Sequence, residues 1–561
     1  MVVSPKPLFK MPGQSEQKMK APRKKEAHRL TSRFTKEDYL YSGGAQYPVN
    51  GLKQLLQPLD ILEATSSRDF SVTGLAYHSE RVMPGHLFVC IKGYKTDGHR
   101  YLAQAAEKGA AAAVVEQIQN GIPIPQFRVA NSRQALAALA DHYYGHPSQK
   151  LKVIGVTATN GKTTTAFMTN AILEEHGLKT GLIGTVVVKI GGTIRPALLT
   201  TPESLDLHYL FDQMVEHGIT HVAMEVSSSG LELFRAGNVD FDIVAINNIS
   251  REHIDLHGSF EAYFNAKAKL IREAGPHQWA IFNLDCPEAA NLVSQTQAKT
   301  ITYGIKNSRA DCLVRNLDLS TGRARFTVEI KNRSIAGQMA TEPVRFDIEL
   351  SVLGLHSVYN AMVAVLAGLL CGVPVETIQH ALQNFRGVER RFELIFEDDI
   401  KVIDDHFANS GNIDVTLETL KFMEYRDLHL VYAIRGSRGV TVNRENAEAL
   451  ARWAPVLGLK KIIATTSISH VLEKDMVTKE EESVFRAVMA EAGLKTIIFP
   501  ELPQAIAEGL AQTQPGDVLL LAGCQGMDHG ARICLEQLKQ QRPHLETEKL
   551  YKALRYRVAG M

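Results

Sequence analysis

The sequence predicts an α/β protein with three domains. Its 561 residues exceed the length of one or two typical domains. Short apolar runs alternate with helical stretches, which is the pattern of mostly parallel sheets covered by helices. The alternation lengthens near residue 150 and starts again near residue 389. We therefore expect a basic, disordered extension over 1–45 and domains over 46–149, 150–388 and 389–561.

Each domain has its own set of predicted elements. In the first, a small α/β unit, we expect helices over 52–62 and 103–110 and strands over 87–93 and 111–117. In the central domain, a doubly wound and mostly parallel sheet, we expect a helix over 163–177 and strands over 153–157, 221–226, 242–248 and 279–284. In the C-terminal domain, a Rossmann-like α/β unit, we expect strands over 428–434, 460–466, 495–500 and 517–523.

Composition excludes several classes of protein. The chain is 45% hydrophobic and 22% charged with a formal net charge of +1, so no overall field favours nucleic acid or an anionic membrane. No apolar run reaches the roughly 18 residues of a transmembrane helix. The six cysteines lack CxxC spacing and indicate buried thiols in a reducing compartment. The basic extension lacks the apolar core of a signal peptide.

Residues 153–167 read VIGVTATNGKTTTAF, an apolar strand followed by a glycine-bearing turn and a helix. The turn amides and the helix N-terminus are donors for a phosphate chain. Lys162 supplies a charge for the β- and γ-phosphates, and the hydroxyl of Thr163 or Thr164 suits Mg²⁺. The first glycine comes one residue earlier than in the standard G-x-x-x-x-G-K-T spacing. These residues alone do not decide whether the protein is an ATPase, a kinase, a switch or a ligase.

Polar residues at strand ends form a second group of candidates. Glu225 ends an apolar strand at the carboxyl edge of the sheet, where α/β ligand sites lie, and its carboxylate suits Mg²⁺. Asn283 and Asp285 follow another strand and are either adenine or ribose contacts or a routine strand end. His253 precedes a helix that carries Lys267. A lone histidine is mostly structural and a lysine mostly solvated, and no zinc pattern is present, so these two residues alone favour a structural interpretation.

The order of the motifs carries more information than any one of them. GVTATNGKTTT is followed by LTTPES, MEVSSSGLELFRAG, NNISREHIDLHGSFEAYFNAKAKL, FNLDCPE and SVLGLHSVYNAMVA. This series resembles the Mur ligases, and within them the MurE-type UDP-N-acetylmuramoyl-dipeptide:amino-acid ligases. Residues 74–116 resemble the UDP-sugar-binding domain of that family. The similarity covers residues 46–393 well.

The resemblance implies a reaction in peptidoglycan precursor synthesis. ATP phosphorylates a carboxylate of the UDP-muramoyl-peptide, and an amino acid amine then attacks the acyl phosphate to give an amide, ADP and phosphate. Phosphoryl transfer needs positioning and charge neutralisation more than covalent help. The resemblance further implies a cytoplasmic enzyme, here expected to be a monomer that uses ATP and Mg²⁺ and binds neither nucleic acid nor membrane.

The resemblance also assigns roles to residues of this chain. Catalysis is expected from Lys162, Glu225, His253 and Lys267. Lys267 falls on the carbamylated lysine of the family, where the carbamate is a ligand for a second Mg²⁺. Mg²⁺ is expected at Thr163, Glu225, His253 and Lys267. ATP is expected at Thr157, Thr159, Asn160, Gly161, Lys162, Thr163, Thr164, Asn283 and Arg391. The UDP-muramoyl-peptide is expected at Ser79, Arg81, Thr200, Thr201, Ser227 and Arg235.

The C-terminal domain departs from the family pattern. The family stretch DYAHTPD is DHFANSG here (405–411), GKGHE is GCQGM (523–527), and the DNPR of diaminopimelate-adding members is TSIS (466–469). Beside the acceptor peptide, Ser229 and Leu233 replace a histidine and a glutamine. Because the arginine for the distal carboxylate is missing, we expect diaminopimelate to be a poor substrate.

The sequence is therefore compatible with three functions. The first is a MurE-type ligase, and the second is a Mur-like ligase that acts on another acceptor in another pathway. The third is a degenerate protein that binds nucleotide or UDP-peptide without catalysis. The complete set of Lys162, Glu225, His253 and Lys267 favours a catalyst. The sequence does not fix which amino acid is added.

Overall fold

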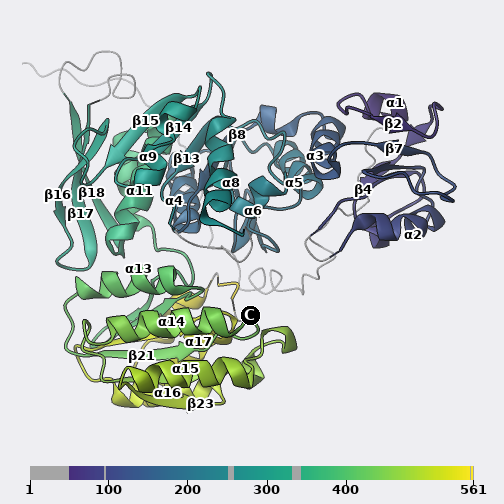
Figure 1. Ribbon diagram of the computed structural model, residues 1–561. Coiled ribbons are helices and arrows are strands. Elements are labelled where there is room, and N and C mark those ends of the chain that lie inside the picture. The colour runs from purple at the N-terminus through teal and green to yellow at the C-terminus, as the bar shows by residue number, and fades with distance from the viewer. Residues whose placement is uncertain (1–49, 94–95, 251–257, 332–342, 556, 560–561) are drawn as a thin grey trace, which may run out of the picture. The chain divides into compact units, whose positions relative to one another are not determined.

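The computed structural model describes residues 50–93, 96–250, 258–331, 343–555 and 557–559. It contains three main sheets, each built from a different part of the chain, and confirms the predicted α/β class (Figure 1). Within the described residues, no helix is both long and apolar enough to cross a membrane.

The first sheet has five strands in the order β2-β7-β6-β5-β4. Its members are β2 (Glu63–Ala64), β7 (Gln126–Arg128), β6 (Ala112–Val115), β5 (His86–Val89) and β4 (Gly74–Ala76), all parallel except β2. A separate pair joins β1 (Asn50–Gly51) to β3 (Ser71–Val72). The helices are α1 (Leu52–Leu55), α2 (Leu102–Glu107) and α3 (Ser132–Tyr143).

The predicted helix over 52–62 is wrong in length, since α1 ends at Leu55. Pro58 explains the early end, because proline has no amide to donate and its ring clashes with the preceding turn. The strands expected over 87–93 and 111–117 are present as the shorter β5 and β6.

The central sheet has eleven strands, and a parallel block forms its middle. In spatial order the parallel block contains β9 (Thr180–Ile183), β12 (His221–Glu225), β8 (Lys152–Thr157), β13 (Ile243–Ile246), β14 (Trp279–Asn283), β15 (Lys299–Gly304) and β16 (Cys312–Asp318). Antiparallel strands extend both edges: β10 (Val187–Ile190) and β11 (Thr193–Pro196) beside β9, and β17 (Arg323–Ile330) and β18 (Val344–Leu353) beside β16.

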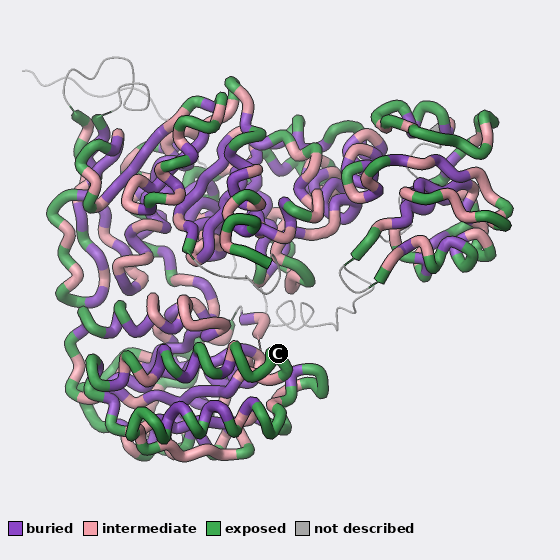
Figure 2. The backbone as a smooth tube through the Cα atoms, in the orientation of Figure 1, coloured by how far each residue is buried: buried purple, intermediate pink, exposed green. Residues whose placement is uncertain are grey.

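Helices cover both faces of this sheet, as the doubly wound prediction requires. One apolar cluster packs α4 (Lys162–Glu175), α11 (Leu355–Leu370) and α12 (Val375–Asn384) against the strands. The cluster on the other face holds α5 (Ser204–Glu216) and α8 (Phe260–Arg272). The short helices α6 (Ser228–Glu232) and α9 (Pro287–Ala290) follow β12 and β14. The strands between the helices are almost entirely buried (Figure 2).

The third sheet has six strands in the order β19-β20-β24-β21-β22-β23. They are β19 (Glu393–Glu397), β20 (Lys401–Asp405), β24 (Val518–Gly523), β21 (Leu428–Ala433), β22 (Lys461–Thr465) and β23 (Lys495–Phe499), and only β19 is antiparallel. On one face pack α13 (Ser410–Lys421), α14 (Val440–Trp453) and α15 (Lys479–Glu491), and on the other α16 (Leu502–Gln512) and α17 (Gly530–Gln541); α18 (Thr547–Leu550) follows.

Candidate active site

The loop between β8 and α4 is shaped by a glycine that no other residue fits. Gly161 adopts φ +92°, and a Cβ there would lie 2.2 Å from Oδ1 of Asn360 on α11. That Asn360 oxygen accepts hydrogen bonds from Asn247 Nδ2 at 2.9 Å and from Thr165 Oγ1 at 3.3 Å, so it cannot easily move. The backbone of the loop therefore passes directly over Asn360 into the first turn of α4.

Two lysines converge on one carbonyl of this loop. Lys162 Nζ donates to the Ala158 oxygen at 2.8 Å and to the Thr159 oxygen at 3.0 Å. Lys267 of α8, which is 1% exposed, donates to the same Ala158 oxygen at 2.6 Å. Its ammonium also lies 4.9 Å from the centre of the Tyr263 ring. The fold thus brings together two residues that are 105 positions apart in the sequence.

Glu225 is fully buried at the end of β12, which pairs with β8, the strand that leads into the loop before α4. Its Oε2 accepts from Thr163 Oγ1 at 2.9 Å and from Thr185 Oγ1 at 2.9 Å, and its Oε1 accepts from the Thr185 amide at 2.7 Å. A buried carboxylate held by hydroxyls, with no lysine or arginine salt bridge among the described residues, is suited to a hard divalent cation. Thr185 was not a sequence candidate, because nothing in its surroundings signals its role.

Three residues expected to bind the acceptor, Thr200, Thr201 and Ser227, lie close to Glu225 and Thr185. Thr185 Oγ1 lies 3.1 Å from Thr200 Oγ1. Thr201 Oγ1 donates to the Glu225 carbonyl at 3.1 Å, accepts from the Ser227 amide at 3.0 Å and lies 3.2 Å from Ser227 Oγ. The start of α4 and the LTTPES segment are therefore joined through Thr163, Glu225 and Thr185.

Arg235 is held by a second carboxylate. Its guanidinium pairs with Glu203 at 3.0 Å, and Glu203 also accepts from Arg133 of α3 at 2.9 Å. Ser79 and Arg81 lie on a short 3-10 turn after β4, where Ser79 Oγ donates to Gln104 at 2.8 Å. No hydrogen bond or ion pair between described residues joins Ser79 or Arg81 to the acceptor candidates of the central sheet. His253 lies outside the described residues.

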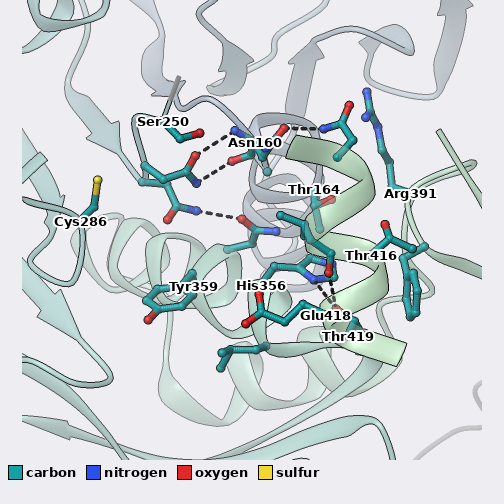
Figure 3. Close-up of a pocket in the computed structure, with 18 of the residues that line it drawn as sticks. Asn160, Thr164, Ser250, Cys286, His356, Tyr359, Arg391, Thr416, Glu418 and Thr419 are labelled. Carbon is teal, nitrogen blue, oxygen red and sulfur yellow. Dashed lines mark hydrogen bonds between the residues drawn. The ribbon is translucent and has the colours of Figure 1, made fainter. Parts of the chain in front are cut away.

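The remaining nucleotide candidates line a cavity of about 470 Å³ (Figure 3). Asn160, Gly161, Thr164, Asn283 and Arg391 all contribute to its wall. Thr157, Thr159 and Thr163 do not line it; Thr159 instead ties the loop to the neighbouring elements, with its Oγ1 2.9 Å from the Tyr263 hydroxyl. Residues of α13 also line this cavity, and the sequence patterns did not predict them. From this helix, Asn412 Nδ2 donates to Asn160 Oδ1 at 2.6 Å.

Asp285 has a structural task beside this cavity. It accepts from the amides of Ile305, Lys306 and Asn307 at 2.7, 3.0 and 2.7 Å, and from the Tyr359 hydroxyl at 3.0 Å. Burial acts to raise the pKa of Asp285, but these amides outweigh it and hold the pKa below the ordinary value. The carboxylate is therefore a fixed anion that organises the loop after β15.

His356 supplies a pH-dependent element in the same wall. It lies at the start of α11, with Nδ1 3.2 Å from Thr419 Oγ1 (Figure 3). Burial disfavours the charged ring and lowers the pKa of His356 to about 4. His356 gains a proton near pH 6.5 in the unfolded chain and only near pH 4 in the folded protein. The free energy of unfolding therefore decreases as the pH falls from 6.5 to 4, because the unfolded chain binds the proton first.

Replacing His356 by glutamine is expected to reduce acid sensitivity. Between pH 7 and pH 5 the wild type should lose up to about 2 kcal/mol more stability than His356→Gln, because only the wild type has this ring to protonate on unfolding. Chemical denaturation of both proteins at the two pH values measures the difference. Equal losses in the two proteins would show that His356 titrates normally in the folded state.

Taken together, the fold and the site are those of an α/β protein in which the loop between a buried strand and helix α4 is suited to holding a phosphate chain. Three sequence profiles match the chain: the catalytic domain of the Mur ligase family over 71–144, the Mur ligase middle domain over 156–368, and the Mur ligase glutamate ligase domain over 390–525. The chain belongs to the Mur ligase family, whose members are ATP-dependent ligases that form amide bonds.

Curated relatives are similar in sequence to this protein over most of its length. A UDP-N-acetylmuramoyl-L-alanyl-D-glutamate--2,6-diaminopimelate ligase of Geobacillus thermodenitrificans is 35% identical over 459 residues, covering 81% of this chain and 89% of the relative. The ligase of the same description from Bacillus licheniformis is 33% identical and covers 81% of this chain and 90% of its own length.

Solved structures agree in fold. A UDP-N-acetylmuramoyl-L-alanyl-D-glutamate--2,6-diaminopimelate ligase has a TM-score of 0.60 at 23% identity, covering 84% of this chain and 93% of that chain. MurF ligase from Thermotoga maritima in complex with ADP has a TM-score of 0.58 at 19% identity, covering 83% and 97%.

Proposed function

We propose that the protein adds an amino acid to a UDP-N-acetylmuramoyl-dipeptide, using ATP, in peptidoglycan precursor synthesis. The observation that carries this proposal is the hydrogen-bonded series Thr163–Glu225–Thr185–Thr200, which joins the nucleotide loop to the acceptor segment. A nucleotide switch has no need of an acceptor segment at this position, and the match to the Mur ligase family favours amide formation over simple phosphoryl transfer by a kinase. The proposal includes a cytoplasmic location and a monomeric state.

The side chains of the chain divide the work of the reaction. Lys162 and the amides at the start of α4 hold the phosphates, and Lys162 neutralises charge that moves to the leaving ADP. Thr200, Thr201 and Ser227 present hydroxyls to the acceptor, and Arg235 is held in place by Glu203. The acceptor carboxylate takes the γ-phosphoryl group and becomes an acyl phosphate. The amine then attacks its carbonyl carbon, the C–O bond breaks, and phosphate and the amide result.

The chemistry of the donor set fits Mg²⁺. Thr163 and Glu225 offer hard oxygen ligands at the phosphate loop, and the ion would supply positive charge to the transferring phosphoryl group. Lys267 fits a carbamate, because two ammonium groups now share the Ala158 oxygen and a carbamate would replace one of these cations by an anion. We include both the ion and the carbamate in the proposal.

A turnover assay tests the proposed function. The protein is incubated with ATP, Mg²⁺ and UDP-N-acetylmuramoyl-dipeptide, and single amino acids are added in turn. We expect phosphate release that depends on one of them, with a product whose mass has gained that amino acid. Phosphate release without amino acid dependence would indicate an ATPase, and no release with any amino acid would favour a binding protein.

Diaminopimelate is expected to be a poor substrate in that assay. At the position of the missing arginine, Ser469 Oγ donates to Glu501 Oε1 at 2.7 Å, so a distal carboxylate placed there meets another carboxylate. Like charges at a binding surface cost several kcal/mol, so kcat/KM should be at least roughly 10-fold below that of the best amino acid. The variant Ser469→Arg should reduce the difference in kcat/KM between diaminopimelate and the best amino acid. Diaminopimelate as the best substrate of the wild type would contradict the prediction.

A further inference from the structure

The carboxyl ends of three parallel strands converge in the third sheet. β21 and β24 pair in the register Ala433 with Gly523, and β22 pairs with β21 through Thr465. Beyond the strand ends, Ser467 Oγ donates to the Gly526 carbonyl at 2.7 Å. A Cβ on Gly526 would lie 3.1 Å from the Ala433 Cβ. Ligands of α/β proteins bind at such an edge.

Arg435, two residues beyond the end of β21, brings an unpaired positive charge to this edge. Among the described residues, its guanidinium makes a single hydrogen bond, from Nη1 to the Ala408 carbonyl, and no ion pair. Its Nε is buried without a hydrogen-bond partner. A guanidinium has five donors in a planar fork that matches a carboxylate, so unmade bonds at a partly buried arginine favour an anionic ligand.

The nearby carboxylates are engaged elsewhere and do not neutralise Arg435. Asp405 accepts from the amides of Phe392 and His406, both at 2.9 Å, and from the Thr416 hydroxyl. Glu481 accepts from the amides of Ser437, Arg438, Gly439 and Thr478 at 2.7–3.0 Å. Asp404 and Asp528 face Arg390. Arg438 differs from Arg435 in having a carboxylate, Asp475, 3.8 Å away.

The two other described side chains that could change charge near Arg435, those of Cys524 and His406, are both shifted away from their charged forms by burial. Burial raises the pKa of the Cys524 thiol, against the opposing pull of Arg435, Arg390, Arg391 and Arg438. Burial, reinforced by Arg390, Arg391 and Arg435, holds the pKa of His406 well below its ordinary value. The Cys524 sulfur lies 3.6 Å from His406 Nε2. Neither side chain therefore supplies an anion to the arginine.

We infer that Arg435 binds the carboxylate of the incoming amino acid, an inference that rests on the proposed function. Arg435 contacts Ala408, and the same loop leads to Asn412, which bonds Asn160 of the phosphate loop. A carboxylate bound at Arg435 leaves the amine of the amino acid unpaired and able to react. The ligand class is an α-amino acid with a free carboxylate, and its carboxamide is excluded.

Thermal unfolding in the presence of ADP tests this site without turnover. The probes are L-alanine, L-serine and L-lysine, each compared with its carboxamide. For the wild type we expect at least one acid to raise Tm more than its carboxamide. The variant Arg435→Gln should lose that difference while its Kd for ATP changes less than about 3-fold. The control Arg486→Gln, which removes an exposed guanidinium paired with Glu482 on α15, should behave like the wild type.

Turnover supplies the second readout. The KM for the amino acid should rise at least about 10-fold in Arg435→Gln, the loss expected for a charge-assisted hydrogen bond. If Arg435→Gln does not fold, Arg435→Lys keeps the charge but not the fork and should still lose several-fold in discrimination between acid and carboxamide.

Three outcomes would overturn the inference: no preference of the wild type for any acid over its carboxamide, unchanged discrimination in a folded variant, or a weakened Kd for ATP in place of weakened amino acid binding. The last outcome would assign Arg435 to a phosphate. Acid-selective binding without turnover on the UDP-dipeptide would leave the site standing and reject the proposed function. Turnover that does not depend on the carboxylate of the amino acid would keep the proposed function and reject the role of Arg435.

Discussion

Replacing Lys162 by alanine is expected to lower kcat by roughly 1,000-fold, the usual cost of removing one preorganised group that stabilises transition-state charge. Lys162 begins α4 and its ammonium reaches the loop carbonyls of Ala158 and Thr159, so a phosphate chain on the loop amides lies within its reach. Charge moves from the γ-phosphoryl group to the leaving oxygen during the transfer, and a fixed cation lowers the energy of that state more than of the ground state. Phosphate release with saturating substrates measures the effect.

Two comparisons separate this role from a structural one. Lys179→Ala removes an exposed lysine in the turn after the same helix and should leave kcat unchanged. Lys162→Arg keeps the charge and the contacts to the loop in part, and should recover some of the lost rate. If Lys162→Ala has an unchanged Tm and an unchanged kcat, the loop does not hold the reacting phosphates.

The parallel strands of this fold could be predicted from the sequence because both of their faces are covered. β8, β12, β13 and β14 are continuous apolar runs, which only a strand between two layers of helices requires. The antiparallel β17 and β18 were missed because one of their faces is exposed and charged residues such as Arg325 and Glu349 alternate with the buried ones. Such alternation is a weaker signal than a continuous run.

The candidate site was predictable where chemistry depends on residue type and order, and not where it depends on long-range contact. Lys162, Glu225 and Lys267 carry charge in a recognisable series of motifs, and the structure gathers them around the Ala158 loop. Thr185 and Asn360 bond directly to site residues, yet threonine and asparagine at such positions are common in any loop or helix. The unpaired state of Arg435 follows from which neighbours the fold has already engaged, and no local pattern encodes that.

Replacing Lys267 by alanine is expected to abolish turnover, with a loss of at least roughly 1,000-fold, while ATP binding persists. A lysine that is 1% exposed and shares the Ala158 oxygen with Lys162 places two cations at one acceptor. In the proposed mechanism, carbamylation by CO₂ would convert the Lys267 amine into an anion, which would replace that repulsion by attraction and offer oxygen ligands to a divalent cation. Phosphate release and nucleotide titration of the same preparation measure the two parts of the prediction.

The neighbouring Lys269 provides the matched control, because it lies on the same helix with its ammonium 3.6 Å from the centre of the Phe234 ring and 3.7 Å from Glu273. Lys269→Ala should retain turnover. If the carbamate is required, wild-type activity should fall when CO₂ and bicarbonate are removed and return when bicarbonate is added, and a small carboxylate such as acetate should partly restore Lys267→Ala by entering the space left by the side chain. A fully active Lys267→Ala, or a wild type indifferent to bicarbonate, would leave the ammonium group as a structural donor to Ala158 and remove the carbamate from the mechanism.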